Sequence, residues 1–426
     1  MNQPLRLAEK AFIILGLSFF SGVFGVQSLG LILPKAVVTL IRFFIWGTST
    51  ALVCVFWKST FITATKNISL CLLTLLALFS FTWSEFPSIT LFNARDILMM
   101  TSFSLYFVTR FKLKEQVQLI GFTLLLGACL STIIALGLPS VGVHGAHSLD
   151  ADIQSESHPG AWKGIYGHKN SLGSMMVLSS LTFFALPKEN SVLYKWGGFS
   201  FSLLLMLLST SKTSLVLSFL LILIMVFYKQ FRWKGKISVI FLDIGILILG
   251  CIALLLFTYW VELLTGLGRD PTLTGRTPIW GVALNRLMER PFLGFGREAY
   301  WASKSKYALE VSRIIGTGWI PPHAHNGLID LALDVGLIGV ALFLITYFTT
   351  FAQSLKRAYA TRNPEELWLL GYLVFLTMNN VTESYLLRQA NIYWVLFITV
   401  AFTASPKIKL LKPSNSTKRK SNLFVA

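Results

Sequence analysis

Long apolar runs separated by short polar segments make up most of the chain. Residues 11–33, 117–138 and 244–260 are three such runs, and none of them contains a charged side chain. A helix needs roughly 20 apolar residues to cross the hydrocarbon core of a bilayer. Lipid offers no partner to backbone polar groups, so spanning segments are helices or strands of a closed barrel, and barrel strands alternate in polarity. Continuous runs therefore predict an all-α integral membrane protein.

The spacing of the runs predicts about 12 transmembrane helices. With the N-terminus inside, every clear basic cluster lies on the cytoplasmic side, as the positive-inside rule requires, and both termini are cytoplasmic. The predicted helices are 11–33, 36–57, 68–83, 96–110, 117–138, 171–187, 193–209, 213–231, 237–260, 326–350, 366–381 and 385–404.

These helices divide the chain into six parts. The parts are the N-terminal transmembrane helices (1–138), an outer loop (139–170), the central transmembrane helices (171–260), a large and partly helical outer loop (261–325), the C-terminal transmembrane helices (326–404) and a basic cytoplasmic tail (405–426). The first run is longer than the apolar core of a signal peptide and lacks a clear cleavage site, so we do not expect its removal. The polar end of the tail is expected to be disordered.

Composition supports this interpretation. The chain is 54% hydrophobic and only 13% charged, with a mean hydropathy of +0.65, which is too little charge to cover a soluble protein of this size. A net charge of +18 would suit nucleic acid, but the basic residues form short clusters between apolar runs. Such clusters favour the anionic headgroups of membrane lipid and not nucleic acid. The four cysteines lie inside apolar runs, where they are expected to pack and not to form disulfides or zinc sites.

All six histidines lie in the two long outer loops. They are His144, His147, His158, His168, His323 and His325. Histidine is the side chain best suited to proton transfer near neutral pH. Any chemistry is therefore expected on the non-cytoplasmic face.

The second outer loop contains a predicted amphipathic helix. Thr277 and Pro278 can form its N-cap and first turn, and Pro291 ends it. Its apolar and basic positions recur at helical spacing on two faces, at Trp280, Leu284, Leu287, Met288, Arg286 and Arg290. The helix is expected to lie at the membrane surface with its arginines directed to the aqueous side, or alternatively only to anchor the loop to lipid headgroups.

The segment 321–326, Pro-Pro-His-Ala-His-Asn, directly precedes an apolar helix. The prolines fix an extended entry, so both histidines reach a helix N-terminus, where unpaired N–H groups favour an anion. A histidine there can lie beside a phosphate or a sugar hydroxyl. Alternatively, His323 and His325 cap the helix and bind interfacial water.

Here the sequence resembles the bacterial O-antigen ligase and O-antigen polymerase superfamily. The resemblance rests on His325-Asn326 followed nine residues later by Gly336-Leu337-Ile338-Gly339, and on the segments 83–87, 164–173, 209–214, 275–280 and 291–296. The segment 164–173, which contains His-Lys-Asn, is similar to the exopolysaccharide-polymerase branch. Along the chain, these similar segments follow one another in the same order as in the superfamily, and together they span about residues 80–400.

The resemblance implies a membrane glycosyltransferase that needs no metal and no cofactor. Its donor would be a glycan on a polyprenyl diphosphate, and its acceptor a hydroxyl of another glycan or of a lipid-linked core. By motif, His325 is the candidate base or hydroxyl-positioning residue, and Arg276 and Lys212 are candidates for binding the diphosphate. Lys212 stands where many relatives have arginine, and it lacks the bidentate fork of that side chain.

Other polar residues of the outer loops are weaker candidates. Further possible phosphate contacts are Arg297, Arg269, Arg286 and Arg290, each of which can equally be a solvated loop charge. Further substrate-site candidates are His323, Asn326, His168 and Lys169, with a local helix cap as the alternative for the last two. Glu383 and Arg388, in a short outer turn, are expected to form a structural pair.

The first outer loop offers a different constellation. His144, His147, Asp150, Asp152 and His158 are close in sequence, and carboxylates with imidazoles can bind divalent metals. The stretch is polar and rich in Ser and Gly, which favours a mobile loop, so no metal site is predicted.

The function predicted is polymerisation or ligation of glycan in surface polysaccharide synthesis, with polymerisation slightly favoured. The place is the outer face of a bacterial cytoplasmic membrane, where the second loop covers a cavity open to lipid and a chain-length regulator is a possible partner. A transporter of the same superfamily is the alternative, because the chain has ionisable residues at Arg42, Lys195, Asp243, Asp330 and Asp334. A scaffold for polysaccharide export is a third hypothesis, and it predicts that His325 is dispensable.

Overall fold

The chain folds as an all-helical bundle in the computed structural model, which describes residues 3–24, 33–145, 159–187, 189–230, 276–315, 320–361 and 363–406. Within these ranges there is no β-strand, and one isolated antiparallel bridge joins Val143 to Trp162. The α-helices are α1 (Gln3–Phe20), α2 (Lys35–Val55), α3 (Trp57–Ala64), α4 (Ile68–Phe79), α5 (Pro87–Arg110), α6 (Leu113–Gly137), α7 (Pro139–Gly142), α8 (Lys169–Phe184), α9 (Val192–Leu208), α10 (Lys212–Gln230), α13 (Arg276–Leu287), α14 (Lys306–Ile315), α15 (Gly327–Ala360), α16 (Pro364–Asn380) and α17 (Ile392–Ala404). Short 3₁₀ turns are η2 (Ser80–Thr82) and η3 (Gly164–Tyr166).

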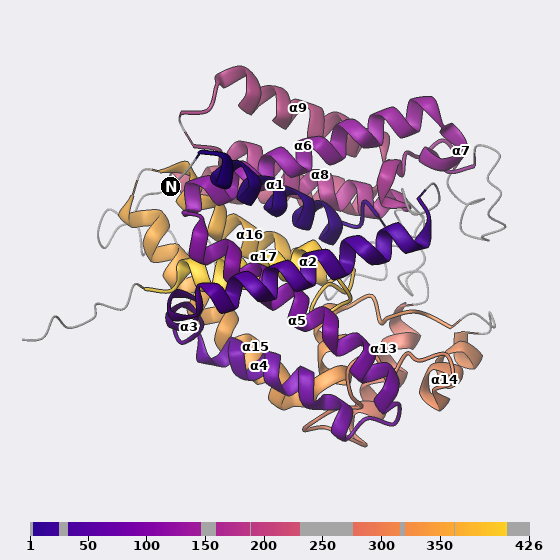
Figure 1. Ribbon diagram of the computed structural model, residues 1–426. Coiled ribbons are helices and arrows are strands. Elements are labelled where there is room, and N and C mark those ends of the chain that lie inside the picture. Colours follow the sequence, from indigo (N-terminus) through magenta and orange to yellow (C-terminus); the bar gives the residue numbers. More distant parts are fainter. Residues whose placement is uncertain are drawn as a thin grey trace, which may run out of the picture.

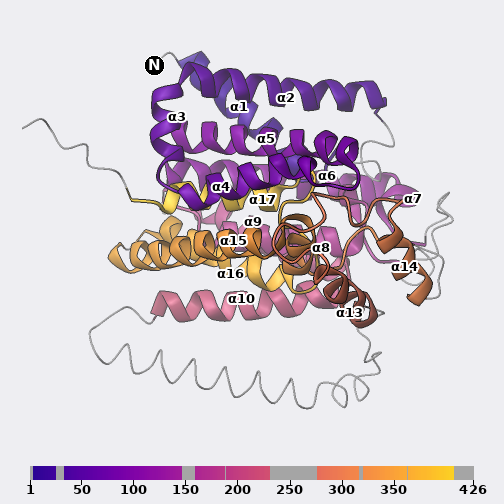
Figure 2. The same ribbon diagram turned by 90° about the horizontal axis from the view of Figure 1, so that it is seen from below.

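Most of the long helices lie side by side along one direction (Figures 1 and 2). α17 is apolar on almost every side, α8 has no separate polar face, and most residues of both helices are buried, so they form the centre of the bundle. The short helices α7, α13 and α14 gather at the end of the bundle opposite the N-terminus. The predicted loop chemistry therefore lies at one end.

Among the described residues, four helices are long and apolar enough to cross a membrane: α2, α6, α10 and α15. A fifth candidate is the pair α3 and α4 with η2, which is bent by 99° at a short break. These lengths and compositions are those of a multi-pass membrane protein. The figure of 12 spans stays a prediction, and its helix at 237–260 lies outside the described residues.

The other eleven predicted helices coincide with helices of the structure, with shifted ends. α5 begins at Pro87, nine residues before the predicted start, because Pro87 fits the first turn of a helix. α17 begins at Ile392 and not near 385, since Asn391 forms its N-cap. The helix predicted from Thr277 is α13, whereas α3, α7 and α14 were not predicted.

A second hydrophobic core lies at the end of the bundle opposite the N-terminus (called the outer end below, after its predicted side), separate from the main core of the bundle. It is built from α13, α14, the turns between them and the start of α15, and its largest side chains include Phe295, Tyr300, Trp301 and Tyr307. Tyr300 and Tyr307 stack with ring centroids 5.4 Å apart. This core fixes α13 against α15, and so fixes the segment between them that carries the two histidines.

The predicted helix at 326–350 is real but interrupted. Gly336 has φ 67° and ψ −174°, which breaks the helical path of α15. The backbone groups freed by the break pair with the turn at 291–296. Phe295 and Gly296 donate to the carbonyls of Leu333 and Asp334, and Leu337 donates to the carbonyl of Pro291, at 2.7, 3.1 and 2.7 Å. Two strings of the resemblance, 291–296 and 336–339, thus form one hydrogen-bonded unit.

Gly336→Ala is expected to destabilise the protein by about 3 kcal/mol. Only glycine adopts this φ/ψ region readily, and an added Cβ would lie 2.2 Å from the carbonyl carbon and oxygen of Phe292. Membrane abundance and the thermal midpoint of the purified protein measure the effect. Gly281→Ala in α13 is the matched control, since its added Cβ meets nothing within 4 Å. Equal stability of the two variants would refute the packing at the break.

Candidate active site

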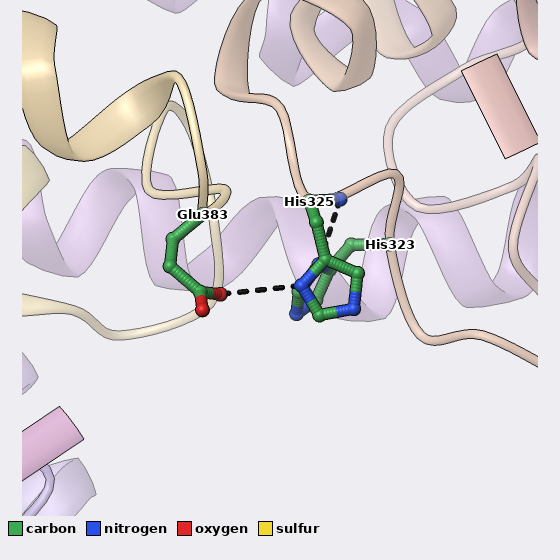
Figure 3. Close-up of side chains that lie close together, drawn as sticks. All are labelled: His323, His325 and Glu383. Atoms are coloured by element: carbon green, nitrogen blue, oxygen red, sulfur yellow. Dashed lines mark hydrogen bonds and ion pairs between the residues drawn. The ribbon is translucent and has the colours of Figure 1, made fainter. Parts of the chain in front are cut away.

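Three side chains from three separate segments meet at the end of the bundle opposite the N-terminus. Nδ1 of His325, in the loop before α15, lies 3.3 Å from Oε2 of Glu383, in the turns after α16. The other carboxylate oxygen of Glu383 lies 3.8 Å from a guanidinium nitrogen of Arg276, the first residue of α13. Figure 3 shows His325 between Glu383 and His323. A candidate base therefore has a carboxylate partner that also faces a cation.

The loop that carries His325 is held in an uncommon conformation. Asn326 forms the N-cap of α15 and accepts hydrogen bonds from the N–H groups of Leu328 and Ile329, at 3.1 and 3.2 Å. His325 has φ 54°, in the left-handed region that costs a non-glycine residue about 1–2 kcal/mol. Its N–H donates to Nδ1 of His323 at 3.2 Å. The cap of α15 is thus Asn326 and not a histidine, which leaves the ring of His325 for another role.

Electrostatics keep Glu383 ionised and His323 neutral. Burial acts to raise the pKa of Glu383, but its hydrogen bond to His325 and the charges of His325, His323 and Arg276 outweigh burial and lower that pKa. Burial lowers the pKa of His323 to about 3, with help from the nearby charges of His325 and Arg388. Of the two histidines, His323 is therefore a permanent hydrogen-bond acceptor at neutral pH.

His323, His325 and Glu383 also have the chemistry of a metal-ligand set. One ligand atom from each lies within 4.8 Å of the others. Imidazole and carboxylate groups suit zinc. The guanidinium groups of Arg276 and Arg388, however, bring positive charge to the same place, as the lowered pKa of His323 reflects. This field favours an anion over a divalent cation, and we assign no metal to the set.

Asp330 is the centre of a buried polar network beside these residues. It is 1% exposed and lies in the first turn of α15. Its carboxylate is bound by Ala324 N–H, Trp301 Nε1, Ser384 Oγ and a guanidinium nitrogen of Arg388. Arg388 also pairs with Glu298 at 3.3 Å. The expected pair of Glu383 with Arg388 is therefore wrong: Arg388 pairs with Asp330 and Glu298, and Glu383 faces His325 and Arg276.

Arg297 does not occupy the place expected of a diphosphate-binding residue. Its side chain is 0% exposed, and its guanidinium donates to the carbonyls of Leu387 and Asn93 at 3.0 and 2.6 Å. A buried arginine that binds backbone carbonyls holds segments together and is not open to a ligand. Arg297 therefore joins α5 to the turns that carry Glu383.

The arginines of the amphipathic helix are engaged in surface ion pairs. Arg286 binds Glu310 of α14 through two nitrogens, at 2.7 and 2.8 Å. Arg290 lies 3.3 Å from Glu85 and donates to the carbonyl of Trp83. Both side chains hold the outer segments to one another. Arg269 lies outside the described residues.

His168, Lys169 and Lys212 form a second polar group at the starts of α8 and α10. Nδ1 of His168 accepts from the N–H of Asn170 at 3.2 Å, which is the local cap weighed above. Ser211, the residue before α10, donates to the side chain of Asn170 at 3.0 Å. Lys212 is exposed. Lys212 begins α10 and Arg276 begins α13, so the two predicted phosphate-binding residues come from different helices.

Of the metal candidates in the first loop, the structure describes only His144. Its ring lies 5.4 Å from that of His168, centroid to centroid. His147, Asp150, Asp152 and His158 lie outside the described residues.

Three residues of the site had no role in the sequence interpretation. Glu383 was assigned to another partner, Asp330 was counted only as an ionisable residue near a helix end, and Trp280 only as part of an apolar face. For two of them the spacing in the sequence could have indicated a place near the site. Asp330 comes five residues after His325, and Trp280 comes one helical turn after Arg276.

Comparison with known protein families finds a match for the middle part of the chain. Residues 197–344 match the family described as O-antigen ligase. The matched segment contains Lys212, Arg276 and His325, whereas Glu383 lies beyond it. This part of the chain is thus similar to the O-antigen ligase and polymerase superfamily.

Individual relatives align over shorter stretches. The exopolysaccharide production protein ExoQ of Rhizobium meliloti is 30% identical over 154 residues, which are 34% of this chain and 35% of that protein. A Rickettsia conorii protein named as a candidate polysaccharide ligase is 31% identical over 93 residues, 20% of this chain and 21% of that one. A protein of Rickettsia felis named in the same way is 24% identical over 139 residues, 31% of this chain and 33% of that one. The chain thus spans about a third or less of the length of these curated relatives.

Proposed function

We propose that this protein is a membrane glycosyltransferase of surface polysaccharide biosynthesis. It transfers a glycan from a polyprenyl-diphosphate-linked donor to a hydroxyl of a glycan or lipid-linked acceptor. The match to the O-antigen ligase family, and relatives named for exopolysaccharide production and polysaccharide ligation, support a role in polysaccharide biosynthesis. The observation that carries the proposal is the meeting of His325, Glu383 and Arg276 at the outer end.

These residues have the chemistry that the transfer requires. The acceptor oxygen attacks the anomeric carbon, the bond from that carbon to the diphosphate oxygen breaks, and the acceptor proton passes to a base. His325 is the base, and the Glu383 carboxylate orients its ring. Arg276 faces the departing diphosphate, whose negative charge grows as the bond breaks. Lys212, His168, Lys169 and the Asn326 amide remain candidates for the remainder of the substrates.

An apolar cavity next to the site supports a lipid-linked donor. Its volume is about 260 Å³, and it lies between α15 and α16. It is lined by Phe343, Tyr347 and Leu376 and reaches Asn326, the residue after His325. A polyprenyl chain is a branched hydrocarbon, so its first units can bury apolar surface here while the diphosphate stays near Arg276.

We place the site on the periplasmic or extracellular face of the cytoplasmic membrane, with both termini in the cytoplasm. The ends of α5 and α15 that carry Arg110, Lys356 and Arg357 lie opposite the site, and their charges suit the cytoplasmic side. The step proceeds without a metal, because proton transfer to His325 and the charge of the arginines supply the chemistry. A regulator of chain length is a candidate partner.

The test is restoration of surface glycan in a host that lacks the gene. Wild type is expected to restore long glycan, whereas His325→Ala, at equal membrane abundance, leaves single repeats or unligated chains on a length-resolving gel. If the His325→Ala strain carries single repeats on the acceptor, the lost activity is that of a polymerase, which the His-Lys-Asn segment slightly favours. If that strain instead accumulates long lipid-linked chains that are not joined to their acceptor, the lost activity is that of a ligase.

Arg313→Ala, on the exposed face of α14, is the control and is expected to restore glycan fully. Full restoration by His325→Ala as well would contradict catalysis by this residue, and would favour transport or a scaffolding role.

A further inference from the structure

The strained conformation of His325 needs support from its neighbours. A left-handed residue relaxes unless the peptide groups around it are held in place. The residue before it, Ala324, is fully buried at 0% exposure and has no functional side-chain group. Its contribution must therefore come from its backbone.

Both backbone polar groups of Ala324 are held by side chains. Its N–H donates to both carboxylate oxygens of Asp330, at 3.1 and 3.0 Å. Its carbonyl, which belongs to the peptide group that leads into His325, accepts from Nε1 of Trp280 at 2.7 Å. The peptides on either side of Ala324 are thus fixed from α15 and from α13.

The same two side chains reach the partners of His325. Trp280 follows Arg276 by one helical turn, so both lie on one face of α13. Asp330 binds Ser384 Oγ, next to Glu383 in the chain, and pairs with Arg388 at 2.9 Å. One carboxylate therefore holds the loop of His325 and the turns of Glu383 together.

We propose that Trp280 and Asp330 are positioning residues for the transfer step, because they hold the Ala324 backbone from both sides and so keep His325 against Glu383. This inference rests on the proposed function. Neither side chain touches substrate. Each acts through the backbone of Ala324, and α13 thereby links the residue that faces the diphosphate to the base.

Trp280→Phe removes the indole N–H together with the smaller ring of the indole, and keeps one aromatic ring at this position. In membranes that contain the host lipid-linked glycan, it is expected to lower kcat about tenfold, the equivalent of one hydrogen bond, with little change in the KM for donor. Trp83→Phe is the matched control, because it removes an indole hydrogen bond of 3.0 Å to the backbone carbonyl of Leu293 and contacts neither Ala324 nor Asp330. It is expected to keep a wild-type rate.

A second measurement does not depend on activity. Diethyl pyrocarbonate modification of His325 in the purified full-length protein, followed by mass spectrometry, is expected to be faster in Trp280→Phe than in wild type, and unchanged in Trp83→Phe. Asp330→Asn is expected to change both readouts in the same direction as Trp280→Phe, provided that it folds. Equal rates and equal modification for the two tryptophan variants would overturn the proposal. If instead His325→Ala were fully active, the proposed function would fail, while the modification experiment would still decide whether Ala324 is held in this way.

Discussion

Glu383→Gln is expected to lower the rate of glycan transfer by at least about a hundredfold. The carboxylate faces Nδ1 of His325 and a nitrogen of Arg276, and its lowered pKa keeps it charged in the neutral range. Glutamine keeps the shape but loses the charge that orients the ring and stabilises the protonated histidine. The rate is measured with membranes of the deletion strain that contain equal amounts of each variant.

Glu310→Gln is the matched control for this experiment. Glu310 is also an outer-face carboxylate bound to an arginine, but its partner is Arg286 and it has no contact with His325. We expect this variant to transfer glycan within about twofold of wild type, since a partly exposed ion pair contributes little. A Glu383→Gln protein as active as Glu310→Gln would exclude Glu383 from the reaction.

His323→Gln is expected to remove much of the acid sensitivity of the folded protein. The pKa of His323 is about 3 in the folded state, against an ordinary value of 6.5, so the unfolded chain binds the extra proton first. The stability that depends on neutral His323 is complete above about pH 6.5 and is lost as the pH falls toward 3. Between pH 6.5 and pH 5 the loss is about 2 kcal/mol.

Glutamine still offers an acceptor to the N–H of His325 but does not titrate in this range. Thermal midpoints of the purified proteins, measured at pH 7 and pH 5, compare the two. The midpoint of wild type is expected to fall more than that of His323→Gln. Parallel decreases would mean that His323 is protonated in the folded state at pH 5.

Helices could be predicted from the sequence because continuous apolar runs need no knowledge of their partners. The predicted segment at 117–138 became α6 with only small changes at its ends. α14 was not predicted, since four of its ten residues are charged or polar and its burial comes from packing of Tyr307 and Val311 in the second hydrophobic core. Short amphipathic helices depend on tertiary contacts more than on local pattern.

The site was only partly predictable for a related reason. His325 could be assigned from its motif, but the partner of a side chain depends on how distant segments fold together. Glu383 follows His325 by 58 residues, and nothing local distinguishes a carboxylate that faces His325 from one that faces Arg388. Arg297 and Arg276 both lie in the second predicted outer loop, and the sequence does not distinguish them. In the structure Arg297 is fully buried, whereas Arg276 lies at the site.

The break in α15 at Gly336 sets the depth of the site relative to the bilayer. The part of the helix after the break, up to Ala360, is about 36 Å long at 1.5 Å per residue, and a hydrocarbon core is about 30 Å thick. The part before the break, which carries Asp330 behind His325, is not needed to cross the membrane. In the proposed transfer, a sugar hydroxyl can therefore arrive from water while the hydrocarbon chain of the donor stays in the lipid. The acceptor does not have to enter the bilayer, and the hydrocarbon chain does not have to enter water.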